Sequence, residues 1–265
     1  ARLMCDADGS TADAADDCGE KWAPYVNSSM QPFLDWVDAQ SDLSRFQIAS
    51  ATVFTTNSPA VVAPNLRVAV HQETLPDFAD DAVLCDADVV SPCDDGLSAF
   101  SRRGCTSARD SYDVIQGTYD NPVYQAGYNE GGRPYRTAES GGQFIYDSGG
   151  VPIRQGIESM CYTLAVPKGD QPDDGWPVVI YGHGTGGNYA SQTFDGTAER
   201  LTALGYAVVG FDNVMHGPRS GMEPEDYIFD AGMAFFNLAN PRASRDNVLQ
   251  GSADLFQLVR LVRNA

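Results

Sequence analysis

The parts of this chain that most restrict its fold are two short apolar runs on either side of a glycine-rich loop and a helical segment. PVVIYG (177–182) leads into the loop, a segment with apolar residues at helical spacing ends before Gly205, and YAVVGFD (206–212) follows. Continuously apolar runs of this length are typical of strands buried inside a parallel sheet. The segment therefore predicts a strand, helix and strand unit with parallel pairing and a right-handed crossover.

Weaker periodicities predict further elements on both sides of this unit. The predicted elements are one or two short helices within 22–40, a strand at 46–56, a short helix at 64–72, a long irregular loop at 76–110, a strand at 112–125, a hairpin at 142–153, a strand at 157–167, a helix at 191–205 and a helix at 245–265. In the strand at 157–167, large apolar residues from Met160 to Val166 alternate with other residues, which predicts burial of one face only. Ser244 or Asp246 is expected to cap the last helix.

Composition limits the class of protein and its partners. A chain of 265 residues with 43% apolar residues is long enough for one large or two modest globular domains. The formal net charge of −19, with lysine only at Lys21 and Lys168, argues against nucleic acid or an anionic membrane surface as a partner. An acidic surface of this kind suits a salty external medium. The sequence has no run of the roughly 20 apolar residues that a transmembrane helix needs.

The six cysteines indicate disulfides and therefore export from the cytoplasm. No two of them have the C-x-x-C spacing of a zinc or redox site. Proximity in the sequence favours the pairs Cys5–Cys18, Cys85–Cys93 and Cys105–Cys161. The first two pairs would close loops, and the third would tie a loop to a strand.

The first 20 residues are acidic and contain almost no large apolar side chains. Such a segment does not bury enough surface to order itself. Its carboxylates are also the hard oxygen ligands that calcium binds, and the candidate ligands are Asp6, Asp8, Asp13 and Asp16. Because the spacing does not match the twelve-residue calcium-binding loop, the interpretation that we favour is a solvated tail closed by a disulfide.

The loop 182–187 (GHGTGG) lies between a predicted buried strand and a predicted helix. Glycines let the backbone turn sharply and let a substrate carbonyl approach closely. Backbone N–H groups that are fixed before reaction stabilise the oxyanion formed in acyl transfer. Because the loop matches neither the phosphate-binding loop nor the dinucleotide-binding fingerprint, an oxyanion-binding loop and a purely structural turn are the two interpretations left.

Three segments together resemble the N-terminal half of an α/β-hydrolase: YGHGTGG (181–187), LGYAVVGFDNVMHGPRSG (204–221) and NVLQGSADLFQLVRLV (247–262). More narrowly, they are similar to large exported bacterial esterases and lipases, in which a β-rich region with a TVFTT strand (52–56) precedes the hydrolase sheet. The resemblance covers about residues 155–265 and is looser before them.

The resemblance implies an α/β fold in three parts. An acidic, cysteine-looped segment at 1–20 is followed by a β-rich, disulfide-stapled region at 21–155. Residues 156–265 would form the first part of a mostly parallel hydrolase sheet that is flanked by helices.

The resemblance also implies roles for single residues. In the family, one oxyanion donor comes from the loop after the third strand, and here it falls on the backbone N–H of Thr185, with Gly184 and Gly186 shaping the turn. The candidates for the border of the substrate pocket are His183, Asp212 and His216. Of these, His183 is expected to pack and hydrogen-bond within the loop and Asp212 to brace it. The chemistry requires no cofactor.

The nucleophile of the family is absent, because neither G-x-S-x-G nor S-x-x-K occurs in the sequence. Since the family's residues follow the order serine, acid, histidine, the triad is expected after residue 265, in a C-terminal half of the same hydrolase on the same or a cleaved chain. The expected function is an exported carboxylic ester hydrolase of the esterase or lipase type, inactive as this chain alone. The alternative is a noncatalytic, calcium-dependent extracellular binding or adhesion module, which the acidic N-terminus favours.

Overall fold

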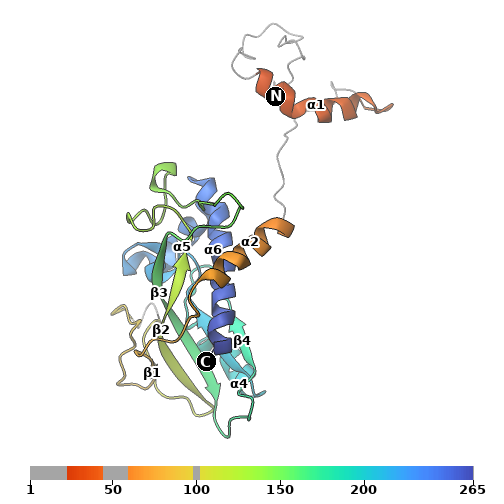
Figure 1. Cartoon of the computed structure of the whole chain (residues 1–265). Helices are drawn as coiled ribbons and strands as arrows, with labels where there is room; N and C mark the ends of the chain where they lie inside the picture. Colours follow the sequence, from red (N-terminus) through yellow and green to blue (C-terminus); the bar gives the residue numbers. More distant parts are fainter. Residues whose placement is uncertain (1–22, 44–58, 98–101, 265) are drawn as a thin grey trace. The chain divides into compact units, whose positions relative to one another are not determined.

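The computed structural model describes residues 23–43, 59–97 and 102–264, and it divides into two compact units, 1–58 and 59–265 (Figure 1). No helix in this described part of the chain is long and apolar enough to cross a membrane.

The first unit contains the helix α1 (Ala23–Asp38), which confirms the helix expected near the N-terminus. The strand expected at 46–56, the Cys5–Cys18 pair and the calcium ligands expected within 1–20 lie outside the described residues.

The second unit is built on a five-stranded sheet with the strand order β1-β2-β3-β5-β4 (Figure 1). The strands are β1 (Val83–Leu84), β2 (Tyr112–Val123), β3 (Gly156–Pro167), β4 (Val178–Tyr181) and β5 (Ala207–Phe211). β4 and β5 pair in parallel, with Val178 opposite Ala207, which confirms the predicted strand, helix and strand order. β5 is buried along its length, but β4 is partly exposed at the edge of the sheet, so the predicted burial of both strands is wrong for β4.

The other neighbouring strands in the described part of the chain pair antiparallel, so the expectation of a mostly parallel sheet is wrong there. The longest ladder joins β2 to β3 along their whole length, with Tyr112 opposite Pro167 and Val123 opposite Gly156. Parallel pairing needs a crossover connection, and β4 and β5 are the pair that a helical crossover joins. The sheet is therefore mixed, with one parallel pair at its β4 edge.

Helices and short 3-10 turns fill the connections. The α-helices are α2 (Pro59–Gln72), α4 (Thr197–Thr202), α5 (Tyr227–Phe236) and α6 (Pro241–Asn264), and the 3-10 turns are η2 (Ala138–Ser140), η3 (Ser191–Thr193), η4 (Gly217–Ser220) and η5 (Pro224–Asp226). The helix expected at 64–72 is confirmed within α2. The helix expected at 191–205 is shorter than predicted, and the left-handed Gly205 follows it with φ of +81°.

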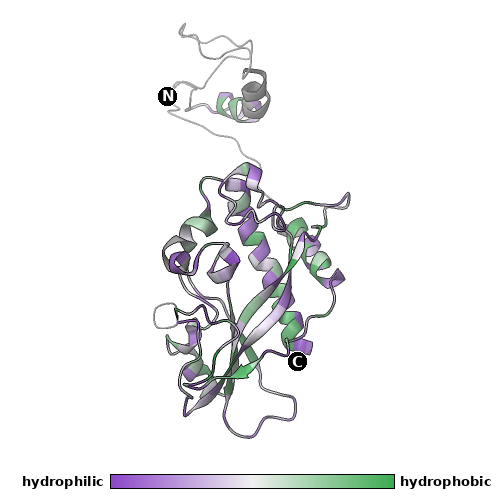
Figure 2. Ribbon diagram, turned by 90° about the vertical axis from the view of Figure 1, so that its left-hand side faces the viewer, coloured by the Kyte–Doolittle hydropathy of each residue, from purple (hydrophilic) through white to green (hydrophobic). Residues whose placement is uncertain are grey.

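The core has one layer on each face of the sheet. On one face, α6 packs Leu258 and Leu261 against β3 and β5, and its alternating polar and apolar bands are visible in Figure 2. On the other face, Ala198 of α4 packs near Val208 of β5, whereas the next residue, Val209, belongs to the α6 side. Because successive strand residues point to opposite faces, both faces of the central strands are covered.

This two-sided cover corrects the prediction for β3. The strand was expected to bury only the face that carries Met160 and Tyr162, and both are buried. Thr163 and Ala165, which point to the opposite face, are also buried. The alternation of residue size along β3 therefore does not separate a solvent face from a core face.

The start of α6 also differs from the prediction. The helix begins at Pro241, and the side chain of Asn240 accepts a hydrogen bond from the N–H of Ala243 at 3.3 Å, as an N-cap residue does. Asp246, one of the two expected caps, is buried and instead accepts the N–H of Phe144 at 2.8 Å. The hairpin expected at 142–153 is confirmed by an antiparallel bridge within it.

The two disulfides of the second unit differ from the predicted pairs. The bonds are Cys85–Cys105 and Cys93–Cys161, with Cα to Cα distances of 5.0 and 6.0 Å, so the pairs Cys85–Cys93 and Cys105–Cys161 are wrong. The pairing of β1 with β2 decides which cysteines lie close enough to bond. The N–H of Cys85 donates to Val114 on β2, which brings Cys85 to the side of the sheet where Cys105 contacts Gln116.

A non-reducing tryptic map distinguishes the two pairings. Cleavage at arginine and lysine puts Cys85 and Cys93 on one peptide (68–102), Cys105 on a second and Cys161 on a third. We expect a single cross-linked species that contains all three peptides. A two-peptide species that joins Cys105 to Cys161, beside an internally bridged 68–102 peptide, would contradict the structure.

Candidate functional site

The glycine-rich loop follows β4 directly and contains a tight turn. The N–H of Gly187 donates to the carbonyl of Gly184 at 3.0 Å, and Gly186 has φ of +80°. A 1–4 hydrogen bond and a positive φ at the third residue are features of a type II β-turn, which favours glycine at that place. Thr185 occupies the second position of this turn.

The backbone N–H groups that follow Thr185 in the loop have protein partners. The N–H of Gly186 donates to His216 Nε2 at 3.2 Å, that of Asn188 to Ser191 Oγ at 3.0 Å and that of Tyr189 to Asp212 Oδ1 at 3.0 Å.

The N–H of Thr185 differs from those of the four residues that follow it in the loop. Within the described residues neither it nor the N–H of Gly184 has a hydrogen-bond acceptor, and both residues are exposed. The Thr185 N–H is therefore available to an oxygen atom of a ligand.

His183 fixes the start of the loop as a neutral acceptor. Its Nε2 accepts the N–H of Asn213 at 2.9 Å, and its carbonyl accepts the side-chain amide of Asn213 at 2.8 Å. Since Nε2 accepts, the ring proton is on Nδ1, which lies 2.8 Å from the carbonyl of Gly184 and donates to it. Burial lowers the pKa of His183, which favours this neutral form.

His216 has the same tautomer for the same reason. Its Nε2 accepts the N–H of Gly186, so Nδ1 carries the proton and donates to the carbonyl of Val214 at 2.9 Å. Burial lowers the pKa of His216 to about 4. The His183 and His216 rings meet edge to face with centroids 4.8 Å apart. Because both Nε2 lone pairs are already used, neither ring is placed as a general base in this arrangement.

Asp212 connects the loop to the stapled region. Its carboxylate is almost fully buried and pairs with Arg103 through two hydrogen bonds of 2.9 and 2.6 Å. The Arg103 guanidinium also lies over the Tyr189 ring, 4.7 Å from its centroid. A bidentate, desolvated pair of this kind fixes geometry strongly. Asp212 thus holds the residue that ends the loop, Tyr189, against the region closed by the Cys85–Cys105 disulfide.

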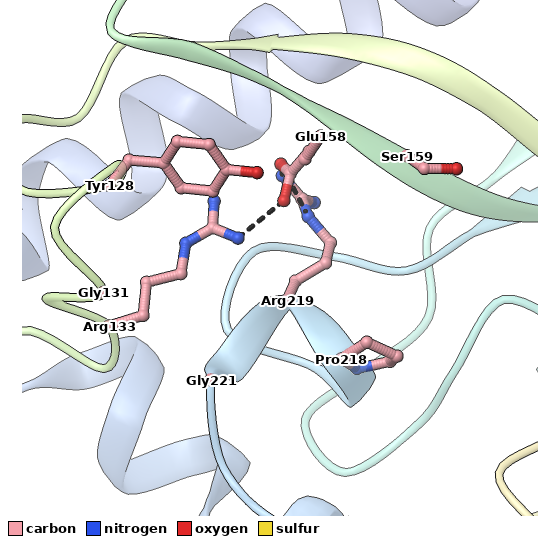
Figure 3. A pocket seen from close by; sticks show the side chains of 8 residues that line it. All are labelled: Tyr128, Gly131, Arg133, Glu158, Ser159, Pro218, Arg219 and Gly221. Carbon is pink, nitrogen blue, oxygen red and sulfur yellow. Dashed lines mark hydrogen bonds and ion pairs between the residues drawn. The ribbon is translucent and has the colours of Figure 1, made fainter.

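A second buried ion pair network lies beside this one. Arg219 contacts Glu158 on β3 at 2.6 Å, Asp254 on α6 at 2.9 Å and the carbonyl of Asp212 at 2.7 Å. Arg133 contacts the other oxygen of Glu158 at 2.6 Å (Figure 3). Burial opposes ionisation of Glu158, but the two arginines lower its pKa to about 2. Glu158 is therefore a carboxylate and not a proton donor near neutral pH.

A cavity of about 370 Å³ opens where β3 meets the segment after β5 (Figure 3). Its lining residues are Tyr128, Gly131, Arg133, Glu158, Ser159, Pro218, Arg219 and Gly221. The charged side chains in its wall are paired with one another, and the Tyr128 ring lies over the Arg133 guanidinium at 4.8 Å.

The structure brings the predicted site residues together around one turn. The loop residues Gly184, Thr185 and Gly186 lie beside His183 and His216, and Asp212 contacts the end of the loop through Tyr189. Their catalytic and pocket roles stay predictions. In the part of the chain that the structure describes, no group of three or more His, Cys, Asp or Glu side chains is arranged to hold a metal ion.

Several residues that hold the loop were not found from the sequence. Arg103, Glu158 and Arg219 are charged residues that carry no motif, and Asn213 carries the N–H group that His183 accepts. The one available signal was the position of Asn213 and Arg219 within the segment 204–221, which resembles the hydrolase family. Sequence patterns do not distinguish a buried, paired arginine from an exposed one.

Comparison with known proteins places the chain in no family. No family model and no curated protein matches it. A solved structure, that of a putative acetyl xylan esterase from Bacteroides fragilis, is similar to it with 14% sequence identity and a TM-score of 0.36. The match covers 77% of this chain and 43% of that protein, so the chain spans less than half of its length. A TM-score of this size does not establish a shared fold.

The positive φ of Gly186 predicts unequal effects of alanine in the loop. We expect Gly186→Ala to lower the free energy of unfolding by about 1 kcal/mol, because an L-residue is strained in this conformation. Gly184→Ala is the matched control, since a Cβ there meets open space and its φ is not positive. Urea denaturation of both variants tests the turn, and equal stabilities would contradict it.

The depressed pKa of His216 predicts a pH dependence. An unfolded histidine has a pKa near 6.5, so between pH 6.5 and about 4 the unfolded chain binds more protons than the folded one. Stability therefore falls as the pH is lowered through this window, by at most about 1.4 kcal/mol per pH unit. His216→Gln keeps an acceptor for the Gly186 N–H but does not titrate.

Denaturation of wild type and His216→Gln near pH 7 and near pH 4.5 measures this contribution. We expect wild type to lose about 2 kcal/mol more than the variant between the two conditions. Identical losses would show that His216 is not held neutral in the folded protein.

Proposed function

We propose that this chain is the N-terminal part of an α/β-hydrolase that cleaves carboxylic esters through a serine acyl-enzyme. The observation that carries the proposal is the free, exposed N–H of Thr185 in a turn whose following N–H groups, from Gly186 to Tyr189, have protein partners. It lies after β4, at the end of the parallel pair. The family resemblance of the sequence supports the same role.

The chemistry assigned to the chain is electrostatic. When a nucleophile attacks the ester carbonyl, its oxygen becomes negative, and an N–H donor held in place beforehand stabilises that charge. Loss of one such donor costs about 3 to 4 kcal/mol of transition-state stabilisation. In this arrangement His216 holds the Gly186 end of the turn and His183 the Gly184 end, so the Thr185 N–H does not have to reorient during reaction.

The nucleophile, acid and base are proposed to belong to a C-terminal segment of the same hydrolase, on the same or a cleaved chain. The sequence contains no G-x-S-x-G, and the Nε2 atoms of His183 and His216 already accept backbone N–H groups. The second oxyanion donor would come from the residue after that serine.

We also propose that the protein is exported, and the two disulfides of the second unit support this, since such bonds persist in oxidising compartments. Calcium binding by the aspartates of residues 1–20 rests on the sequence alone. A melting temperature that is unchanged by a chelator would count against it.

Proline at position 185 tests the proposed donor directly. Proline is favoured at the second residue of a type II turn, so Thr185→Pro keeps the turn and removes only the N–H. In the protein that carries the downstream serine, we expect kcat for p-nitrophenyl acetate to fall by about 10² to 10³. Thr185→Ala, which keeps the N–H, is the matched control.

Two results would contradict the proposal. One is a Thr185→Pro enzyme as active as Thr185→Ala. The other is labelling of the isolated 265-residue chain by a fluorophosphonate probe, since the chain is proposed to lack the nucleophile.

A further inference from the structure

α5 and the residues after it expose an unusual amount of apolar surface. Only Asp230 among the ten residues of α5 is charged. Met233 is 65% exposed, Phe236 is 55% exposed and Leu238, just beyond the helix, is 81% exposed. A helix that is apolar on nearly all sides is normally buried, so this face is expected to have an occupant.

The exposed face of α5 begins beside the candidate oxyanion donor. A Cβ placed on Gly232 would lie 3.0 Å from the Thr185 methyl carbon, so the helix rests on the turn. Phe236 is one helical turn after Gly232 and lies on the same face, and Met233 is next to Phe236 on the helix surface because residues three apart are neighbours. The apolar face thus runs away from Thr185 along α5.

The other side of α5 is fixed to the protein. The Phe235 ring lies 6.3 Å from the His216 ring and packs with Val214 and Met215. The carbonyl of Phe235 accepts the side-chain amide of Asn247 on α6 at 2.7 Å. The helix is therefore held against the loop by contacts that do not involve Met233 or Phe236.

We propose that the face formed by Met233, Phe236 and Leu238 binds the aliphatic acyl chain of the substrate. This inference rests on the function proposed above, because an ester whose carbonyl oxygen accepts the Thr185 N–H has its acyl chain next to Gly232 and Phe236. The substrate class is then esters of medium or long aliphatic acids, and acetyl esters would leave the face uncovered.

The size and charge of the surroundings favour a single acyl chain over a larger partner. Three partly exposed side chains offer on the order of 400 Å² of surface, whereas a stable protein interface buries about 800 Å² on each partner. The net charge of −19 also opposes approach to an anionic membrane. An alkyl chain needs less area than a protein interface does, and because it is uncharged the acidic protein does not repel it.

Methyl-labelled NMR of the protein that carries the downstream serine, with that serine replaced by alanine, tests the proposal without requiring catalysis. With ¹³C-methyl methionine, titration with methyl octanoate should give a saturable shift of the Met233 signal. The fully buried Met160 and Met215 serve as internal controls and should not shift. Each buried methylene tightens binding by up to about fourfold, so methyl acetate should bind at least about tenfold more weakly.

Two variants show whether the α5 face is responsible. Phe236→Ser should weaken methyl octanoate binding by about fivefold, whereas Leu204→Ser, which removes a comparable apolar side chain that is 72% exposed after α4, should leave it unchanged. Equal affinities for the two esters, or an unchanged affinity in Phe236→Ser, would overturn the proposal. Phe236-dependent sedimentation with neutral phosphatidylcholine vesicles would also overturn it, in favour of a membrane surface.

The amide signal of Thr185 separates this inference from the proposed function. If methyl octanoate shifts Met233 through Phe236 but leaves the Thr185 amide unchanged, the acyl-chain site stands and the oxyanion role is contradicted. If both esters shift the Thr185 amide alike and Met233 does not respond, the oxyanion role stands and the acyl-chain site is wrong.

Discussion

Arg219 makes the contacts on which the arrangement of the candidate site depends. Its guanidinium is buried and joins Glu158 on β3, Asp254 on α6 and the carbonyl of Asp212 after β5. Removing charges from water costs several kcal/mol per ion, and only good geometry and full hydrogen bonding offset that cost. Movement of any one of these elements would break one of these buried contacts. The elements at this end of the sheet are therefore held in one arrangement. Asp212 positions the loop relative to them, because its carboxylate accepts the N–H of Tyr189 at the end of the loop.

Two neutral histidines also fix the position of the turn. His183 and His216 each use Nε2 as an acceptor and Nδ1–H as a donor. His183, in the loop, accepts the N–H of Asn213 after β5, and His216, after β5, accepts the N–H of Gly186 in the loop. The consequence is a turn that is held at both ends, in which the exposed N–H of Thr185 has no acceptor among the described residues. Rigidity before reaction is the property that makes a dipole effective in stabilising a developing charge. The same contacts explain why these histidines hold the loop instead of acting as bases in this chain.

Features that depend on neighbouring residues could be predicted from the sequence more often than contacts between residues far apart in the chain. β4, β5 and their parallel pairing follow from the continuous apolar runs on either side of Gly205. The run at 206–212 also predicts the burial of β5, but the run at 177–182 does not, because β4 is a partly exposed edge strand. The disulfides were assigned wrongly, since the ladder between β1 and β2 brings Cys85 to Cys105 and sequence proximity does not. α5 is absent from the predicted elements because periodicity alone does not distinguish a helix from a buried strand in so short and so largely apolar a run. The network around Arg219 was missed because burial of a charge depends on tertiary partners.

The central claim is that the Thr185 N–H binds the oxyanion of an ester. The most direct measurement is a crystal structure of the protein that carries the downstream serine, after reaction with an alkyl phosphonate that mimics the tetrahedral intermediate. We expect the phosphonyl oxygen within about 3.1 Å of the Thr185 nitrogen, with the Gly186 and His216 contact intact. A phosphonyl oxygen held by other donors, with the Thr185 N–H facing solvent, would contradict the account.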